Sequence, residues 1–289
     1  METTANYTEE ESKAIAREYK ELLRISYQTL TDEDKKVIRL AFDTAVNAHK
    51  NQRRKSGEPY IFHPIAVAKI VAQRIGLDAV SIAAALLHDV VEDTEYTNED
   101  IEQLFGKTIA HIVAGLTKIS HLSRENDISL QAENFRKLLL TMNDDVRVIL
   151  IKIADRLHNM QTMDSMAEYK QTKIASETLY IYAPIAHRIG LYNIKTELED
   201  LALKYTDPER YFMILGKMEE SKEEQQSYID AFTKIVETSL NEQKIDYYIK
   251  GRPKSIYSIN RKMESQGVTF EEVYDKFAIR IIYKSEPSE

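Results

Sequence analysis

Residues 79–94 read AVSIAAALLHDVVEDT, and this stretch decides the fold that we expect for the chain. The pattern predicts a helix from Ala79 to about Val91, with Asp78 as its N-cap. Near the end of this helix, ionisable residues are spaced four positions apart, so the two side chains of each pair lie on the same helix face about one turn apart. These pairs are His88 with Glu92 and Asp89 with Asp93. The stretch therefore predicts a helix end at which one imidazole and three carboxylates crowd together.

Outside this stretch the chain is also helical in pattern, because apolar residues recur at spacings of three and four. Thr97 and Asp100 form a variant of the capping box at the start of one helix, which Gly106 is expected to end. The segment NQRRKSGEPY at residues 51–60 interrupts the pattern and is expected to be a basic loop. The other expected helices cover residues 7–30, 34–49, 64–76, 108–118, 129–142, 144–163, 170–188, 193–205 and 208–242.

The composition changes near residue 245. Residues 245–249 and 277–283 read as strands, with a helix near residues 253–264 between them. A strand–helix–strand run of about 45 residues is too small to be a domain, and the chain stops just after its most apolar strand. We therefore expect a truncated α/β unit at residues 243–289, after a helical domain at residues 1–200 and a helical connection at residues 201–242.

Charge and composition exclude several classes of protein. The 289 residues hold 39 Lys and Arg against 47 Asp and Glu, so the formal net charge is −8. The chain thus lacks the basic footprint of a non-specific nucleic-acid binder, and without cysteines it has no disulfides, thiol nucleophiles or cysteine-based metal sites. The N-terminus is polar and acidic, and no apolar run reaches the ~18–20 residues that span a bilayer. We expect a cytoplasmic protein with no membrane or direct nucleic-acid partner.

His63 can supply a second imidazole, and Asp155 a further carboxylate, to the group of ionisable residues at this helix end. His63 is expected at the N-cap of the helix that Pro64 opens, and Asp155 lies in the apolar run VRVILIKIADRLHNM, where an unpaired charge is expensive. Carboxylates near a helix C-terminus are unfavourable by ~0.3–1 kcal/mol each, and a divalent cation would remove much of that cost. Two His and two Asp without thiolate suit Mn, Fe or Zn, with positions left for water and substrate.

Each of these residues also has an ordinary interpretation when it is taken alone. The pair His88-Asp89 could be a polar helix end, and His63 could be only a helix cap. Taken jointly, the residues favour a metal site, an interpretation that depends on the family pattern described below and not on spacing alone. His158 stands out together with Asp155 and Asn159. Four other histidines read as packed or surface residues; they are His49, His111, His121 and His187.

The loop RRKSG at residues 53–57 concentrates positive charge just before His63. Arginine offers a planar fork for phosphate and a flat face for a base, while lysine adds a point charge. The loop therefore suits a polyanionic nucleotide, and the alternative is an ordinary solvated loop.

Three strings in this order carry a resemblance to a known family: RRKSGEPYIFHP, LLHDVVEDT and IKIADRLHNM. Over roughly residues 30–200 the chain closely resembles the hydrolase half of the RelA/SpoT homologues, the bifunctional (p)ppGpp synthetase/hydrolases, and the His-Asp pair also marks the wider HD phosphohydrolases. The resemblance implies a mainly α fold, with an all-helical HD-type domain. It implies one Mn²⁺ held by His63, His88, Asp89 and Asp155. It also implies that Glu92 and Asp93 handle the hydrolytic water, and that the nucleotide is contacted by Arg54, Lys55, Ser56 and Asn159.

The C-terminal strings GRPKSIYSINRKM and VYDKFAIRIIY resemble the start of the family's synthetase domain, which has a nucleotidyltransferase-like α/β fold. That match implies an Mg²⁺ ligand at Asp275 and contacts to ATP phosphates from Arg252, Lys254, Ser258 and Lys262. The rest of that domain is absent, so we expect no synthesis from this chain, although the full-length protein would also be a GTP pyrophosphokinase. Family members contact the ribosome through regions that are likewise absent here.

The resulting hypothesis is Mn²⁺-dependent removal of pyrophosphate from the 3′ position of (p)ppGpp, giving GDP or GTP. One alternative is an HD phosphohydrolase that acts on another nucleotide. The other is a non-catalytic, nucleotide-sensing module whose metal site is structural or empty.

Overall fold

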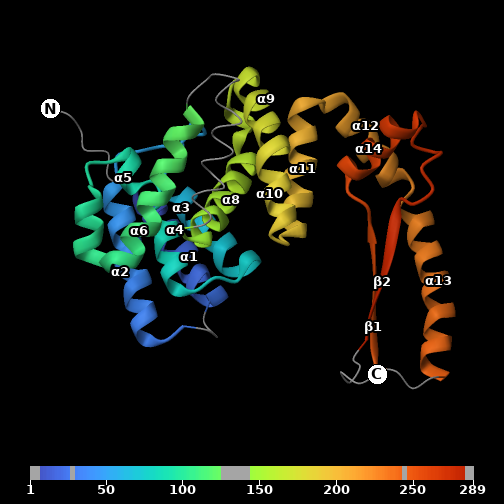
Figure 1. The fold of residues 1–289 in the computed structure, drawn as a ribbon, viewed down its shortest axis with the longest axis horizontal. Helices are drawn as coiled ribbons and strands as arrows, with labels where there is room; N and C mark the ends of the chain where they lie inside the picture. The colour runs from blue at the N-terminus through green and yellow to red at the C-terminus, as the bar shows by residue number, and fades with distance from the viewer. Residues whose placement is uncertain (1–6, 27–29, 125–143, 243–245, 284–289) are drawn as a thin grey trace. The chain divides into compact units, whose positions relative to one another are not determined.

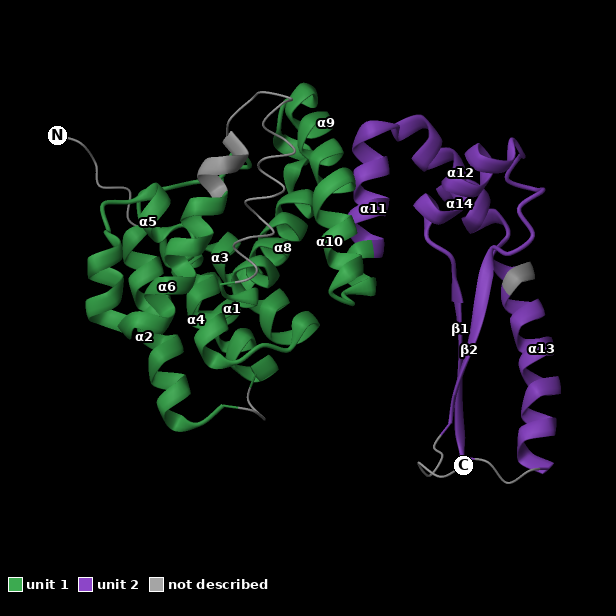
Figure 2. Cartoon of the chain, viewed as in Figure 1, with its two compact units in different colours: residues 1–195 green, residues 196–289 purple. Residues whose placement is uncertain are grey.

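The structure is a computed structural model that describes residues 7–26, 30–124, 144–242 and 246–283. The chain divides into two compact units, residues 1–195 and 196–289 (Figure 2). Its described part is mainly helical, with one two-stranded sheet near the C-terminus (Figure 1). The predicted mainly α fold with a small C-terminal α/β segment is therefore confirmed. Among the residues described, no helix combines the length and apolarity needed to cross a membrane.

Helices form the described part of the first unit. They are α1 (Glu9–Ser26), α2 (Asp32–Ala48), α3 (Phe62–Ile70), η1 (Val71–Ile75), α4 (Ala79–Leu87), α5 (Val90–Asp93), α6 (Asn98–Arg124), α8 (Val146–Gln161), η2 (Met163–Ser165), α9 (Glu168–Glu177), η3 (Thr178–Tyr182) and α10 (Ala183–Arg188). Helix α11 (Tyr192–Thr206) starts in this unit and continues into the second. The expected helix 129–142 lies outside the described residues.

Helix α4 is central to the core of the first unit. It packs against α2, α3 and α6, and α3 packs in turn against α8. Its apolar and small side chains, such as Ala83, Ala84 and Leu87, have no exposed surface. Because every residue of α4 except Val80 is buried, the residues at the end of the helix lie in the interior.

Local signals set several helix boundaries as predicted. Asp78 caps α4 by accepting a hydrogen bond from the Ser81 backbone nitrogen. Thr97 and Asp100 exchange the hydrogen bonds of a capping box ahead of α6. Gly106 interrupts the helical backbone inside α6 with a φ of 81°, a region that glycine adopts without steric cost.

The helix expected at 79–91 is wrong at its end. Helix α4 stops at Leu87, and a separate short helix, α5, begins at Val90. Asp89 lies between them with φ −103° and ψ −3°, so its backbone departs from the helix. His63 also differs from its prediction: it lies in the first turn of α3, whose N-cap is Ile61.

The second unit contains α12 (Pro208–Glu220), α13 (Lys222–Glu242), β1 (Tyr247–Pro253), α14 (Ile256–Gln266) and β2 (Phe277–Tyr283). The strands are antiparallel, and Tyr247 pairs with Tyr283 at one end while Pro253 pairs with Phe277 at the other. Its apolar core gathers residues of α11, α12, α14 and the turn that follows α14. They are Leu203, Ile214, Ile256, Ile259, Met263, Phe270 and Val273.

Three expectations for this unit are corrected. The single helix predicted over 208–242 is divided at Ser221, whose hydroxyl donates to the Lys217 carbonyl and competes with continued helix. The strand predicted at 245–249 instead covers Tyr247–Pro253, because each residue of this range pairs with a residue of β2. The helix predicted near 253–264 begins at Ile256, after Ser255 as its N-cap.

Candidate metal centre

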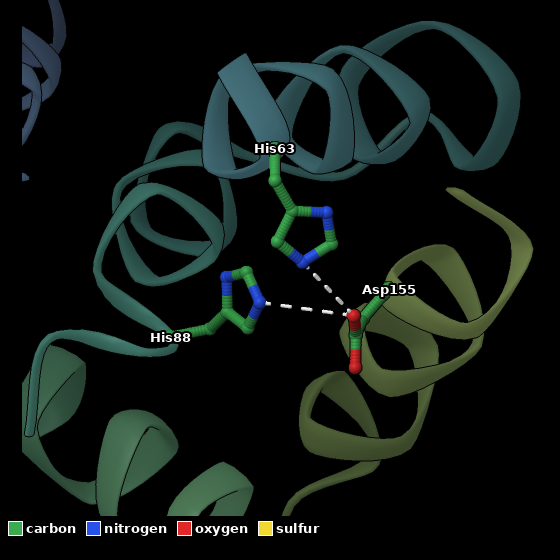
Figure 3. Close-up of side chains that lie close together, drawn as sticks. All are labelled: His63, His88 and Asp155. Carbon is green, nitrogen blue, oxygen red and sulfur yellow. Dashed lines mark ion pairs between the residues drawn. The ribbon is translucent and has the colours of Figure 1, made fainter. Parts of the chain in front are cut away.

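His63, His88 and Asp155 converge from different helices on one buried point. His63 comes from α3, His88 from the end of α4 and Asp155 from the middle of α8 (Figure 3). One ligand atom from each lies within 4.8 Å of the other two, and the residues are 2%, 2% and 4% exposed. The tertiary fold therefore joins three of the four predicted metal ligands into one cluster.

The fourth predicted ligand, Asp89, lies at the edge of this cluster. Its Oδ2 atom is 3.0 Å from His88 Nε2 and 3.7 Å from His63 Nε2. The same oxygen accepts a 2.6 Å hydrogen bond from the Tyr60 hydroxyl. The break between α4 and α5 allows this arrangement, because it turns Asp89 toward the same point as His88.

The described residues fit a divalent ion by their spacing. Asp155 Oδ1 lies 3.2 Å from His63 Nε2 and 3.8 Å from His88 Nε2. Such separations suit ligands that share one ion at about 2.0–2.2 Å from each nitrogen or oxygen. Nitrogen and carboxylate donors without sulfur are also the usual set for a borderline divalent metal.

The tautomer of His88 gives a second and independent indication. Its Nδ1 atom lies 2.8 Å from the Ala85 carbonyl oxygen, so Nδ1 carries the proton and donates it. Nε2 is buried. It lies 3.0 Å from Asp89 Oδ2 but forms no hydrogen bond with the described residues. A backbone carbonyl that fixes Nδ1–H and leaves Nε2 for an ion is typical of metal-binding histidines. The cluster is therefore a candidate site for a divalent metal ion.

The electrostatics of the cluster favour a cation. Burial works against a charged carboxylate, but Lys152, with Nζ 2.8 Å from Asp155 Oδ2, and the two imidazoles lower the pKa of Asp155 well below its usual range. Although burial opposes the charged imidazole, the carboxylates of Asp89 and Asp155 raise the pKa of His88 to about 9. A divalent ion would be attracted by the same carboxylates, and its binding would displace the proton from His88.

Glu92 and Asp93, the residues predicted to handle water, lie in α5 beside the cluster. Asp93 is exposed, whereas Glu92 is half-buried. The Asp93 backbone accepts a 2.6 Å hydrogen bond from the Gln52 side chain, and Asp93 Oδ2 lies 3.4 Å from the Tyr60 hydroxyl. Asp93 is thus held near Asp89 through Tyr60 and keeps access to solvent.

The basic loop is tied to α8 through Arg54. One guanidinium nitrogen, Nη2, donates to Asn159 Oδ1 at 3.0 Å and to Thr162 Oγ1 at 3.2 Å. Asn159 donates in turn to Asp155 Oδ1 at 2.6 Å, so the loop and the cluster are one hydrogen-bonded network. The other guanidinium nitrogen, Nη1, is buried without a hydrogen bond to the described residues. Lys55 and Ser56 are exposed in the same loop.

The sequence singled out His158 beside Asp155 and Asn159 without giving it a role, and it did not point to Tyr60 or Thr162. Tyr60 bonds to Asp89, and His158 Nδ1 lies 2.8 Å from His63 Nδ1. A signal for part of this set was present, because Asp155, His158, Asn159 and Thr162 are spaced i, i+3, i+4 and i+7 on one helix face. The contact of Tyr60 with Asp89 joins residues 29 positions apart and has no comparable local signal.

The other histidines lie in varied surroundings. His49 is fully buried, and its Nδ1 lies 2.7 Å from the Gln52 side-chain oxygen. His111 and His187 are exposed. The side chain of His121 lies outside the described residues.

In the second unit, the predicted Mg²⁺ ligand Asp275 forms ion pairs with both Lys254 and Lys262. These lysines lower the pKa of Asp275 to about 2 by hydrogen bonding to its carboxylate. Ser258 lies in the first turn of α14, where its backbone nitrogen donates to Ser255 Oγ, and Arg252 is exposed on β1. The structure therefore brings together three of the five residues predicted to bind ATP and Mg²⁺.

Comparison with known proteins places these two regions in families. Residues 41–192 match the HD domain, and residues 251–288 match the region found in RelA / SpoT proteins. The chain therefore belongs to the HD domain family, and the RelA/SpoT region that follows its HD domain makes it a member of the RelA/SpoT homologues.

Two curated relatives agree with this assignment. The chain is 45% identical over 260 residues to the GTP pyrophosphokinase of Myxococcus xanthus, covering 89% of this chain and 34% of that protein. It is 45% identical over 256 residues to the bifunctional (p)ppGpp synthase/hydrolase SpoT of Escherichia coli strain K12, covering 88% and 36%. A solved structure described as a metazoan ortholog of SpoT that hydrolyses ppGpp matches with a TM-score of 0.46 and 28% identity, covering 60% of this chain and 96% of that one. The chain spans about a third of the length of the curated relatives that it matches.

Proposed function

We propose that this chain hydrolyses the 3′-pyrophosphate of (p)ppGpp to give GDP or GTP, with Mn²⁺ as its cofactor. The observation that carries the proposal is the buried cluster of His63, His88 and Asp155, joined through Asn159 to the arginine of a basic loop. A metal centre beside a cationic loop suits a substrate that combines a scissile phosphoester with several negative charges. The name of the Escherichia coli relative, a (p)ppGpp synthase/hydrolase, supports the same substrate.

In this proposal the metal is held by His63, His88, Asp89 and Asp155. When bound, a divalent ion acts as a Lewis acid and makes water acidic enough to supply hydroxide near neutral pH. Tyr60 orients Asp89 by donating to its Oδ2. Lys152 keeps Asp155 ionised.

Glu92 and Asp93 are proposed to orient and deprotonate the attacking water. Asp93 suits the task because it is exposed and its Oδ2 lies 3.4 Å from the Tyr60 hydroxyl, which donates to Asp89. A general base must lie within hydrogen-bond reach of the proton it takes, directly or through one water. The position of Asp93 beside Tyr60, which donates to Asp89, supports this role for a water bound at the edge of the cluster.

Arg54, Lys55, Ser56 and Asn159 are proposed to bind the nucleotide. Arg54 is anchored by Nη2, and its buried Nη1 has hydrogen-bonding capacity that a phosphate oxygen could use. Lys55 is exposed and adds a mobile point charge for the diphosphate. Together these groups would offset charge that develops on the leaving pyrophosphate.

For the second unit, we propose that Arg252, Lys254, Ser258 and Lys262 contact ATP phosphates and that Asp275 holds Mg²⁺. The ion pairs of Asp275 with both lysines mean that the phosphates would have to draw the lysines away before the carboxylate could bind the ion. These residues are proposed to contribute to the kind of synthesis that the name of one relative, GTP pyrophosphokinase, describes.

Incubation of the purified chain with ppGpp, with and without Mn²⁺, tests the proposed hydrolysis directly. We expect released pyrophosphate and GDP only with the metal. Asp89→Ala should abolish turnover and reduce metal content, and Asp230→Ala, a change on exposed α13, serves as its control. Faster cleavage of dGTP or a cyclic dinucleotide than of ppGpp would favour another nucleotide as substrate. Binding of ppGpp without any cleavage would instead favour a sensor.

A further inference from the structure

His158 contacts the metal-ligand candidate His63 on the side away from Asp155. His63 Nε2 faces Asp155 Oδ1 at 3.2 Å, while His63 Nδ1 lies 2.8 Å from His158 Nδ1. The two ring centroids are 4.9 Å apart, and the rings are tilted by 36°. His63 is only 2% exposed, so water cannot easily replace this contact.

The short contact between nitrogens restricts where the protons lie. Two imidazole nitrogens 2.8 Å apart must share one proton, because one has to donate and the other has to accept. If His63 binds an ion through Nε2, its proton is on Nδ1 and is donated to His158 Nδ1. His158 then carries its own proton on Nε2. If His158 Nδ1 donates to His63 Nδ1 instead, the proton of His63 is on Nε2, and that nitrogen cannot bind a metal.

His88 provides an internal comparison. Its Nδ1 donates to the Ala85 carbonyl, a backbone acceptor that cannot be removed by substituting a side chain. At His63 the corresponding acceptor is the side chain of His158. The two imidazoles thus have equivalent partners, one from the backbone and one from the helix that also carries Asp155.

We infer that His158 is a positioning residue that holds His63 in the tautomer and orientation needed to bind the metal ion. This inference rests on the proposed metal-dependent function. Partners of this kind, which hydrogen bond to a ligating histidine, change metal affinity by about 10- to 100-fold when they are lost. His158 occupies the position three residues after Asp155, so α8 supplies both a ligand and the group that orients another ligand.

The test is the affinity of the whole chain for Mn²⁺ without any nucleotide, measured by electron paramagnetic resonance of the free ion. His158→Phe keeps a ring of similar size but removes the acceptor, and we expect affinity to fall by about 10- to 100-fold. His158→Asn keeps an acceptor close to the position of Nδ1 and should restore most of the affinity. His111→Asn changes an exposed histidine and is the matched control.

Unchanged affinity in His158→Phe, or equal loss in both His158 variants, would overturn the inference. If His158→Phe does not fold, the wild-type chain still decides. With ¹⁵N-labelled histidine and diamagnetic Zn²⁺, the His63 signals must show a proton on Nδ1, and a proton on Nε2 would contradict the assignment. Because neither measurement uses ppGpp, a failure of the proposed hydrolysis leaves this test intact.

Discussion

The two clusters predicted to carry chemistry use similar groups but differ in their exposure to water. In the first unit, Asp155 has a side chain only 6% exposed and is surrounded by two imidazoles and Lys152. In the second, the Asp275 side chain is 49% exposed and is paired with Lys254 and Lys262. A buried carboxylate is strongly coupled to its partners, whereas exposed pairs are screened by solvent. The first cluster is therefore held by strongly coupled buried groups, whereas the ion pairs of the second are weakened by solvent.

The largest difference should be seen when each aspartate is removed. Asp155→Ala breaks a buried ion pair, so we expect the free energy of unfolding to fall by about 3–5 kcal/mol. Asp275→Ala breaks exposed pairs and should cost less than about 1 kcal/mol. Urea unfolding followed by circular dichroism measures both, and equal losses would remove the distinction between the clusters.

Metal binding should stabilise the fold through the first cluster and not through the second. At a free Mn²⁺ concentration a hundred times the dissociation constant, we expect the free energy of unfolding to rise by about 2.7 kcal/mol. His88→Asn should lose most of that gain because one ligand is altered, whereas Asp275→Asn should keep it. Thermal unfolding with and without Mn²⁺ provides the measurement, and a gain of the same size in His88→Asn would contradict the metal centre.

Replacing Arg54, which links the basic loop to α8, should have a smaller effect, and the quantity affected should be catalytic efficiency. Arg54→Lys keeps the charge but loses the planar fork, and a hydrogen bond to a charged group is worth about 1.5–3 kcal/mol. We therefore expect kcat/KM for ppGpp to fall by roughly 10- to 100-fold. Arg53→Lys is the control, since Arg53 pairs with Glu11 at the surface. Unchanged kcat/KM in both variants would show that the loop acts only through its charge, and similar losses in both would show that the effect is not specific to Arg54.

The smallest expected effect is the pH dependence of the exposed cluster. Hydrogen bonds from Lys254 and Lys262 lower the pKa of Asp275 from 3.8 to about 2. Because the folded pKa is the lower one, the stabilisation is present above pH 3.8 and is lost as the pH falls toward 2. The melting temperatures of wild type and Asp275→Asn should therefore differ more at pH 5 than at pH 2. A difference that does not change with pH would show that these pairs contribute nothing to stability.

Much of the helical architecture could be predicted, because its signals are local. Thr97 and Asp100 lie three residues apart, so the capping box at the start of α6 is visible in the sequence. Gly106 likewise marks a backbone that leaves the helix. The end of α4 could not be predicted in this way. Nothing in the order HDVVED distinguishes a continuous helix from one that breaks at Asp89.

The sequence patterns alone predicted much of the helical architecture, the apolar run around Asp155 and the histidine and carboxylate types that a divalent ion prefers. Only the tertiary structure decided which atoms of these residues meet. Tyr60 reaches Asp89, Arg54 reaches Asn159 and His158 meets His63 across 29, 105 and 95 positions of chain. Local propensity acts within a turn or two of helix. The direction of a buried side chain is set instead by helices packed around it, and these belong to distant parts of the chain.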